Sequence, residues 1–139
     1  MIDLQELEFR VLAELEEAGQ GDIPTTLNVV YLGSPSNFGL DPYLEALKNL
    51  TQRDQIRMSV ARDQDGHLVL LSLEASLRQI DAKSADLNFN ASEGLWIDAS
   101  RSGPPFGPNY PYIVLTMAGR IKSRELLTAR GYQWWSPVN

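Results

Sequence analysis

The segment spanning residues 40–50 constrains the fold of this chain most, because it combines a complete helix signal with a strand pattern shortly after it. Asp41 stands where a helix is expected to begin, and Pro42 takes the first helical position, where a missing N–H costs little. Three leucines at helical spacing predict the buried side of this helix: Leu44, Leu47 and Leu50. The residues expected on its outward side are Tyr43, Glu45, Lys48, Asn49 and Gln52.

Two helices are predicted before this segment. Apolar residues recur at helical spacing over Asp3–Ala18, where Asp3 can cap the first turn and Gly19 ends the pattern. A second, short helix is expected to start at a capping threonine, Thr25 or Thr26, after an extended link. Its β-branched residues give it a low intrinsic helix propensity, so packing has to hold it in place.

A strand, turn and strand pattern follows the third helix. Apolar and polar residues alternate over Ile56–Val60, which predicts a half-buried strand. Asp63 and Asp65 belong to a turn that ends at Gly66, a residue suited to a positive φ. The segment His67–Leu73 is expected to return as a second strand and to complete a hairpin.

The second half of the chain has weaker patterns. The elements expected there are a short helix at Glu74–Ile80, a loop at 81–92, a strand at Leu95–Ile97, a proline-rich loop at 102–111, a strand at Tyr112–Leu115 and a helix from Thr116 to about Arg130. The proline-rich loop can dock on a partner or only span two strands, and the spanning role is favoured. Trp134 and Trp135 either pack on the core or form an exposed patch, and core packing is favoured.

The charge of the chain is unevenly distributed. Its 139 residues carry a formal net charge of −6, and one domain fits this length. Residues 1–47 hold nine acids and one base, whereas residues 48–139 hold nine acids and eleven bases. This asymmetry is compatible with a basic surface facing a polyanion, and equally with charges scattered over a solvated surface.

Other features of the composition exclude some kinds of site and of protein. The chain has no cysteine, which excludes disulfide frameworks and thiolate metal sites. No apolar run approaches the ~20 residues of a membrane span. The acidic first residues lack the pattern of a secretory signal, so a cytoplasmic location without membrane contact is expected.

The order of three helices and a strand pair over residues 3–73 resembles the winged helix-turn-helix superfamily. A second cue is Leu115-Thr116-Met117-Ala118-Gly119-Arg120, which is similar to the L-T-x-x-G-R segment that leads from the wing into a helix in many winged-helix proteins. Here the segment comes long after the Gly66 turn. Either an insertion separates the two, or the strands around the proline-rich loop are the true wing. The resemblance implies a single α+β domain, with a winged-helix core at 1–75 and a C-terminal strand, loop, strand and helix at 76–139.

This resemblance also implies a function. In winged-helix regulators the third helix enters the DNA major groove and the wing touches the backbone. The chain is therefore expected to bind double-stranded DNA as a homodimer and to regulate transcription, with polar side chains reading bases and cations neutralising phosphates. The residues implied in DNA contact are Ser36, Asn37, Tyr43, Lys48, Asn49, Gln52, Arg53, Arg57 and Arg62. An ordinary solvated face is an equally weighted interpretation of these residues.

The alternative function is a non-enzymatic protein-interaction module, of a phage-type or accessory kind, that uses the same scaffold without touching DNA. The net charge, the acidic early residues and the aromatic chain end favour it. The cations of the last helix suit either phosphate contact or the polar side of a dimer helix. No enzyme activity, cofactor or metal centre is predicted, because His67 is the only histidine and Asp63 and Asp65 are better explained as turn formers.

Overall fold

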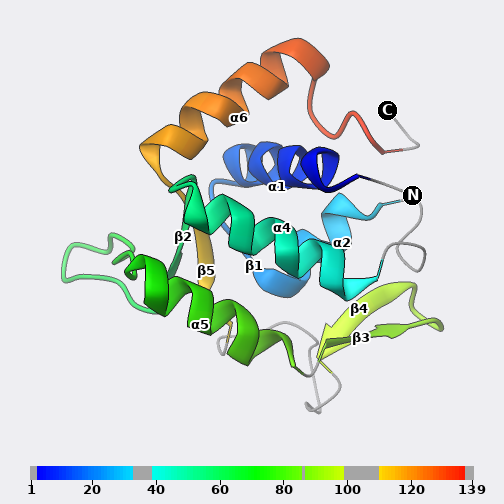
Figure 1. Cartoon of the computed structure of the whole chain (residues 1–139), viewed down its shortest axis with the longest axis horizontal. Coiled ribbons are helices and arrows are strands. Elements are labelled where there is room, and N and C mark those ends of the chain that lie inside the picture. Colours follow the sequence, from blue (N-terminus) through cyan, green and yellow to red (C-terminus); the bar gives the residue numbers. More distant parts are fainter. Residues whose placement is uncertain (1–2, 33–38, 86, 99–109, 137–139) are drawn as a thin grey trace.

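Two small sheets lie among the helices, in a computed structural model that describes residues 3–32, 39–85, 87–98 and 110–136. The helices are α1 (Leu4–Ala18), α2 (Ile23–Val30), α4 (Leu40–Gln52), α5 (Leu73–Ser84) and α6 (Met117–Arg130). The strands are β1 (Gly21–Asp22), β2 (Ile56–Ser59), β3 (Leu87–Asn90), β4 (Leu95–Asp98) and β5 (Tyr112–Leu115). Figure 1 shows α6, α1, α4 and α5 as successive neighbours. The fold class is α+β, as predicted.

The first helix follows its sequence signal closely. The backbone N–H of Glu6 donates to Asp3 Oδ1 at 2.8 Å, so Asp3 is the N-cap, and Gly19 ends the helix with a φ of 85°. The predicted apolar stripe is buried, with Leu7 and Val11 fully covered. This stripe packs against α2 and α4.

The second helix starts earlier than predicted. Its N-cap is Asp22, whose Oδ1 accepts the backbone N–H of Thr25 at 2.8 Å. A threonine cap was the expectation, but Asp22 leaves strand β1 in an extended conformation that places its carboxylate at the helix start. The β-branched helix is held by burial, since Ile23, Leu27 and Val30 are completely covered.

The third helix forms as predicted, but one residue expected on its outward side is buried. It begins at Leu40 rather than Asp41, after Gly39, whose φ is 77° and which makes no side-chain cap. Tyr43, predicted to face outward, is completely buried, and its hydroxyl donates to the carbonyl oxygen of Ile23 at 2.8 Å. The reason is that neighbouring elements enclose much of α4, so its buried arc is wider than the leucines indicate.

The main sheet has the strand order β1-β5-β2, and all its pairs are antiparallel. The predicted strands at residues 56 and 112 are confirmed, and they pair with each other through Met58 opposite Ile113. β5 is the central strand. It therefore joins two strands that come much earlier in the chain.

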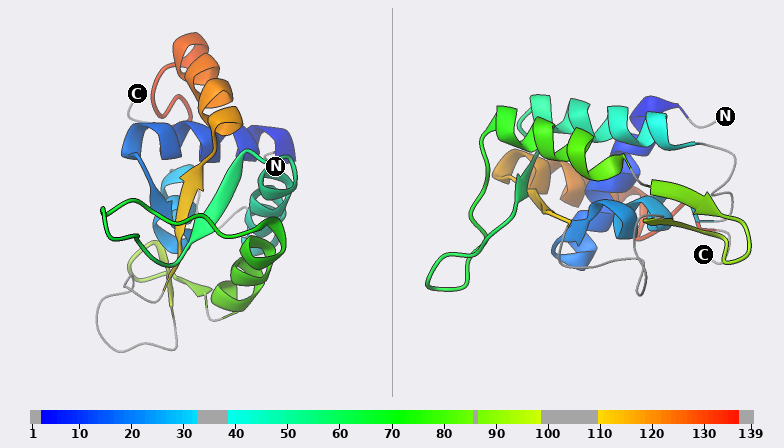
Figure 2. Two further views of the ribbon diagram at one scale, coloured as in Figure 1. Left: turned by 90° about the vertical axis from the view of Figure 1, so that its left-hand side faces the viewer. Right: turned by 90° about the horizontal axis from the view of Figure 1, so that it is seen from below.

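The predicted hairpin after β2 is wrong in its second half. His67–Leu73 does not form a strand, and only a single bridge, Arg62 to Leu68, is present. Residues 60–72 instead form a loop, called the projecting loop, which extends away from the body in Figure 1 and in the right panel of Figure 2. The residue types in this segment were not sufficient to form a strand. Val69 and Leu70 stay largely exposed, so a regular strand here would bury little apolar surface.

The chain between the projecting loop and β5 forms α5 and the β3–β4 hairpin. Ser72 caps α5, which is longer than predicted, and β3 lies where a loop was expected. The strand β4 pairs with β3 and not with β5, so the proline-rich loop does not connect a strand pair. The alternative in which the strands around the proline-rich loop pair as a wing is therefore wrong, and α5 and the β3–β4 hairpin lie between the Gly66 turn and β5. Most of the proline-rich loop, including Phe106, lies outside the described residues.

The last helix explains the sequence cue at its start. Thr116 is the N-cap of α6, and its Oγ1 accepts the backbone N–H of Gly119 at 3.2 Å. Gly119 lies so close to the backbone of Gln55 that no Cβ fits there.

The two tryptophans after α6 are anchored to the body of the protein, as favoured. The indole N–H of Trp134 donates to Glu6, and that of Trp135 donates to the carbonyl oxygen of Val29.

Candidate functional site

Of the nine residues implied in DNA contact, those that the structure describes do not form a free polar face. Ser36 and Asn37 lie outside the described residues, and Tyr43 is buried in the core. Asn49 uses its side-chain amide to donate to Glu8 Oε2 at 3.1 Å. Gln52 is exposed at the end of α4.

The cations of this set are held by carboxylates or carbonyl groups of the same chain. Lys48 Nζ lies 2.6 Å from Asp81 on α5, and Arg53 lies 2.7 Å from the buried Glu8 on α1. Each pair ties α4 to a neighbouring helix. Exposed pairs of the Lys48 kind are worth little, but a buried carboxylate such as Glu8 needs its partner.

Arg57 and Arg62 are also engaged. Arg57 pairs with Asp54 at 2.7 Å and donates to the carbonyl oxygen of Thr51 at 2.6 Å, so it covers the C-terminal end of α4. Arg62 donates to the carbonyl oxygen of Gly66 at 2.8 Å and lies over the ring of Tyr112. Part of the hydrogen-bonding capacity of each guanidinium group is therefore used within the chain.

The exposed stripe of α4 has an acidic character. Its most exposed members are Asp41, Glu45 and Gln52. Affinity for DNA comes largely from cations that neutralise phosphates. An outward side with two carboxylates and with its cations already paired lacks that attraction.

Acids near the start of the chain form ion pairs with bases near its end. Glu16 on α1 lies 3.0 Å from Arg124 and 3.9 Å from Arg120 on α6. Glu6 accepts from Arg130 at 2.8 Å as well as from Arg10 and Trp134. The acidic first helix and the basic last helix are therefore complementary neighbours (Figure 1).

Two carboxyl groups on α1 have opposite pKa shifts. Burial alone would raise the pKa of Glu6, but hydrogen bonds from Trp134, Arg10 and Arg130 outweigh it and hold that pKa below its ordinary value. Burial raises the pKa of Glu14, against the opposing hydrogen bonds from Gln133 and Tyr132. Glu14 Oε1 is buried without a hydrogen-bond partner among the described residues.

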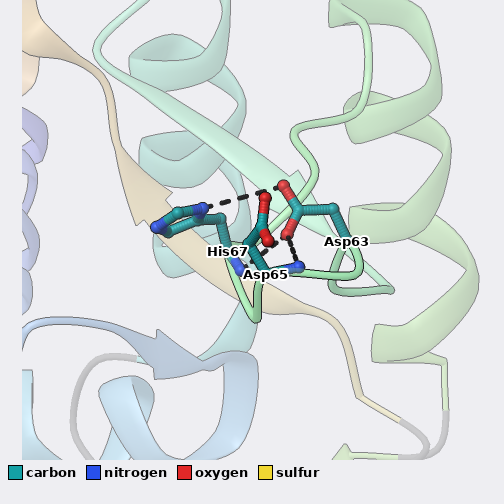
Figure 3. Close-up of side chains that lie close together, drawn as sticks. All are labelled: Asp63, Asp65 and His67. Atoms are coloured by element: carbon teal, nitrogen blue, oxygen red, sulfur yellow. Dashed lines mark hydrogen bonds and ion pairs between the residues drawn. The ribbon is translucent and has the colours of Figure 1, made fainter.

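The tip of the projecting loop gathers Asp63, Asp65 and His67, as Figure 3 shows. Asp63 Oδ1 accepts the backbone N–H groups of Asp65 and His67 at 2.9 and 3.0 Å, so Asp63 forms the turn as predicted. The three side chains could offer ligand atoms within 4.8 Å of one another, but all three are exposed. This geometry is explained by turn formation alone.

Exposed apolar side chains gather at two places that the sequence patterns did not single out. Val60, Val69 and Leu70 on the projecting loop are 57%, 47% and 45% exposed. Met117 and Ile121 on α6 are 72% and 57% exposed, and Ile121 lines an open hollow of about 550 Å³.

No described helix is long and apolar enough to cross a membrane. The candidate sites described above are exposed surfaces of the projecting loop and of α6. The comparisons with known proteins do not assign them, because no family model, no curated protein and no solved structure matches this chain.

Proposed function

We propose that this chain is a non-enzymatic protein-interaction module on a winged-helix-like scaffold, and that it binds a basic partner protein with its projecting loop. The scaffold assignment is supported by the order α1, α2, α4 and β2, by the loop that follows β2, and by the way β5 pairs with β2 and leads into α6. This order agrees with the resemblance drawn from the sequence.

The observation that carries the proposal is the apolar surface of the projecting loop. Val60, Val69 and Leu70 expose about half of their surface on a segment that stands away from the body (Figure 2). Apolar side chains grouped on a projecting segment are typical of protein contacts, where a few such residues carry most of the binding energy.

The charges of the loop tip indicate the kind of partner. Asp63 and Asp65 lie at the tip, and the whole chain carries a net charge of −6. A partner with an apolar groove and a basic rim would match both the valines and leucine of the loop and its carboxylates. Such an acidic module competes with nucleic acid for the partner's basic surface.

DNA binding is the second candidate, and the element order favours it. Gln52, Arg78 and Lys83 are exposed on α4 and α5, and neither Arg78 nor Lys83 has a carboxylate partner among the described residues. If this candidate is correct, the Lys48→Ala and Arg57→Ala variants each weaken binding to random duplex DNA and lower its salt slope by about one phosphate's worth. Electrophoretic retardation measured across a salt series checks this.

The deciding experiment measures duplex binding and loop-dependent protein binding on the same preparations. We expect no retardation of random duplex DNA between about 50 and about 200 mM salt. We expect a nuclease-treated lysate to yield a partner that can be identified, purified and bound directly by the wild type, and bound at least about tenfold more weakly by a Val69→Asp/Leu70→Asp variant.

The matched control is Ile121→Asp, which places the same charge at an exposed apolar position on α6. This variant should keep the partner at wild-type affinity. Salt-sensitive retardation of the duplex that is reduced by Lys48→Ala would replace the module with the regulator. Partner binding that survives the loop substitutions would remove the loop from the model.

A further inference from the structure

We infer that the outer side of α6 is the docking surface for a second copy of this chain, related by a two-fold axis. This inference goes beyond the proposed function, because it concerns a helix at the opposite side of α1 from α4 and leaves the projecting loop free. Figure 1 shows α6 at the outer edge of the layer of helices, next to α1.

The two sides of α6 differ in burial. Gly119, Ser123 and Leu126 are buried where the helix packs inward. On the other side, Met117 and Ile121 are 72% and 57% exposed. Ile121 is far more exposed than an isoleucine of the core, which makes this side an unpartnered helix face.

An open hollow lies along the same side. Its volume is about 550 Å³, and its lining comes entirely from α6: Ile121, Arg124, Glu125, Thr128 and Ala129. The small side chains of Thr128 and Ala129 leave room beside the bulkier Ile121. In an antiparallel pair, the Ile121 side chain of each helix would lie over the small Thr128 and Ala129 side chains of the other helix.

The charges favour an identical helix as that partner. In an antiparallel pair centred between Arg124 and Glu125, each Arg124 faces the partner's Glu125, and each Ile121 faces the partner's Thr128. A two-fold axis makes every such contact twice. Arg124 is 65% exposed and binds Glu16 through its Nε, so its remaining guanidinium N–H groups can reach a second carboxylate.

Nearby carboxylates reduce the positive charge of α6. Arg120 and Arg124 share Glu16, Arg130 lies beside Glu6, and Lys122 lies 3.9 Å from Glu125. A surface whose cations are partly compensated attracts nucleic acid less strongly, whereas neighbouring charges of both signs suit a second copy of the same helix.

Sedimentation velocity over a broad range of protein concentration tests the proposal. The full chain should convert from monomer to dimer as concentration rises. Ile121→Asp should weaken dimerisation by about tenfold or more, because it places two carboxylates in an apolar contact. The control is Val69→Asp, an equally drastic change on the projecting loop, which should leave the dimer unaffected.

A charge exchange tests the register independently. In E125R, each Arg124 faces an arginine of the other copy and dimerisation should weaken, whereas the R124E/E125R double variant restores opposite charges and should recover the dimer. Circular dichroism of each variant verifies that the fold is kept. A monomer at every concentration, a dimer unaffected by Ile121→Asp, or a double variant no better than E125R would overturn the proposed interface.

Discussion

At the residue scale, Gly119 fixes how α6 meets the end of α4. A Cβ at this position would overlap the carbonyl group of Gln55, and the same carbonyl oxygen accepts the backbone N–H of Thr116 at 3.1 Å. Glycine is needed here for close backbone approach, and its φ is not left-handed. The glycine of the sequence cue therefore has a packing role.

We predict that Gly119→Ala destabilises the protein by about 3 kcal/mol, because the methyl group forces the α4 end and α6 apart. Thermal or urea unfolding measures this change. The control is Ala118→Ser at the exposed neighbouring position, which should shift stability by at most about 0.5 kcal/mol. Equal stability of Gly119→Ala and the wild type would contradict the close approach.

The two shifted carboxyl groups of α1 predict opposite pH effects on stability. The fold lowers the pKa of Glu6 from 4.5. The stability that ionised Glu6 contributes is therefore present above pH 4.5, and it is lost as the pH falls through the lowered pKa. The pKa of Glu14 is raised from 4.5, so its contribution is complete below that pH and is lost as the pH rises through the raised value.

Urea unfolding across pH should therefore separate Glu6→Gln from Glu14→Gln. Glu6→Gln should cost about 2 kcal/mol near neutral pH, because charge-assisted hydrogen bonds are weakened, and the difference from wild type should shrink in acid. Glu14→Gln should gain stability relative to wild type as the pH rises. Parallel pH curves for the two variants would argue against the opposite environments of these groups.

At the element scale, the side chain of Asn28 on α2 is hydrogen-bonded to the β3–β4 hairpin, whose Leu87 and Trp96 are buried in the core. Asn28 Oδ1 accepts the backbone N–H of Trp96 at 2.8 Å, and Asn28 Nδ2 donates to the carbonyl oxygen of Trp96 at 3.0 Å. The side chain thus replaces the strand that would otherwise pair with this part of β4. Phe89 and Trp96 then pack edge to face across the hairpin.

We predict that Asn28→Ala loosens the hairpin while leaving the main sheet in place. Losing both hydrogen bonds should cost about 1–3 kcal/mol locally. Hydrogen exchange should speed up at residues 87–98 and stay unchanged at residues 56–59. Equal acceleration in both segments would mean that the hairpin and the sheet open together, contrary to a local attachment.

Sequence patterns predicted the helices better than the irregular regions. The apolar stripe of α1 and the cap at Thr116 depend on neighbouring residues, so local spacing was sufficient for them. The strand expected after His67 does not form along the second edge of β2, because Met58 there donates its backbone N–H to Ser76 Oγ on α5 and accepts the backbone N–H of Leu71. Strand β3 has no strong alternation and was missed, since its support comes from Trp96 and Asn28 in other elements.

At the scale of the whole molecule, the candidate site was harder to predict than the fold. The cations near α4 were found, but their partners Glu8 and Asp81 come from other helices and have no local signature. The hydroxyl group of Tyr43 donates a hydrogen bond to a carbonyl oxygen within the core. Its polar character therefore did not indicate that the side chain is buried. Net charge and its distribution along the chain cannot show which charges neutralise one another.

The central position of β5 in the main sheet bears on how this protein is made. A ribosome releases β1 and β2 long before β5 emerges, and neither early strand is hydrogen-bonded to the other in the finished sheet. Until then both strands expose unpaired edges, which is the condition under which nascent chains attract chaperones or aggregate. The emergence of β5 from the ribosome is thus the step at which the early strands gain their partner.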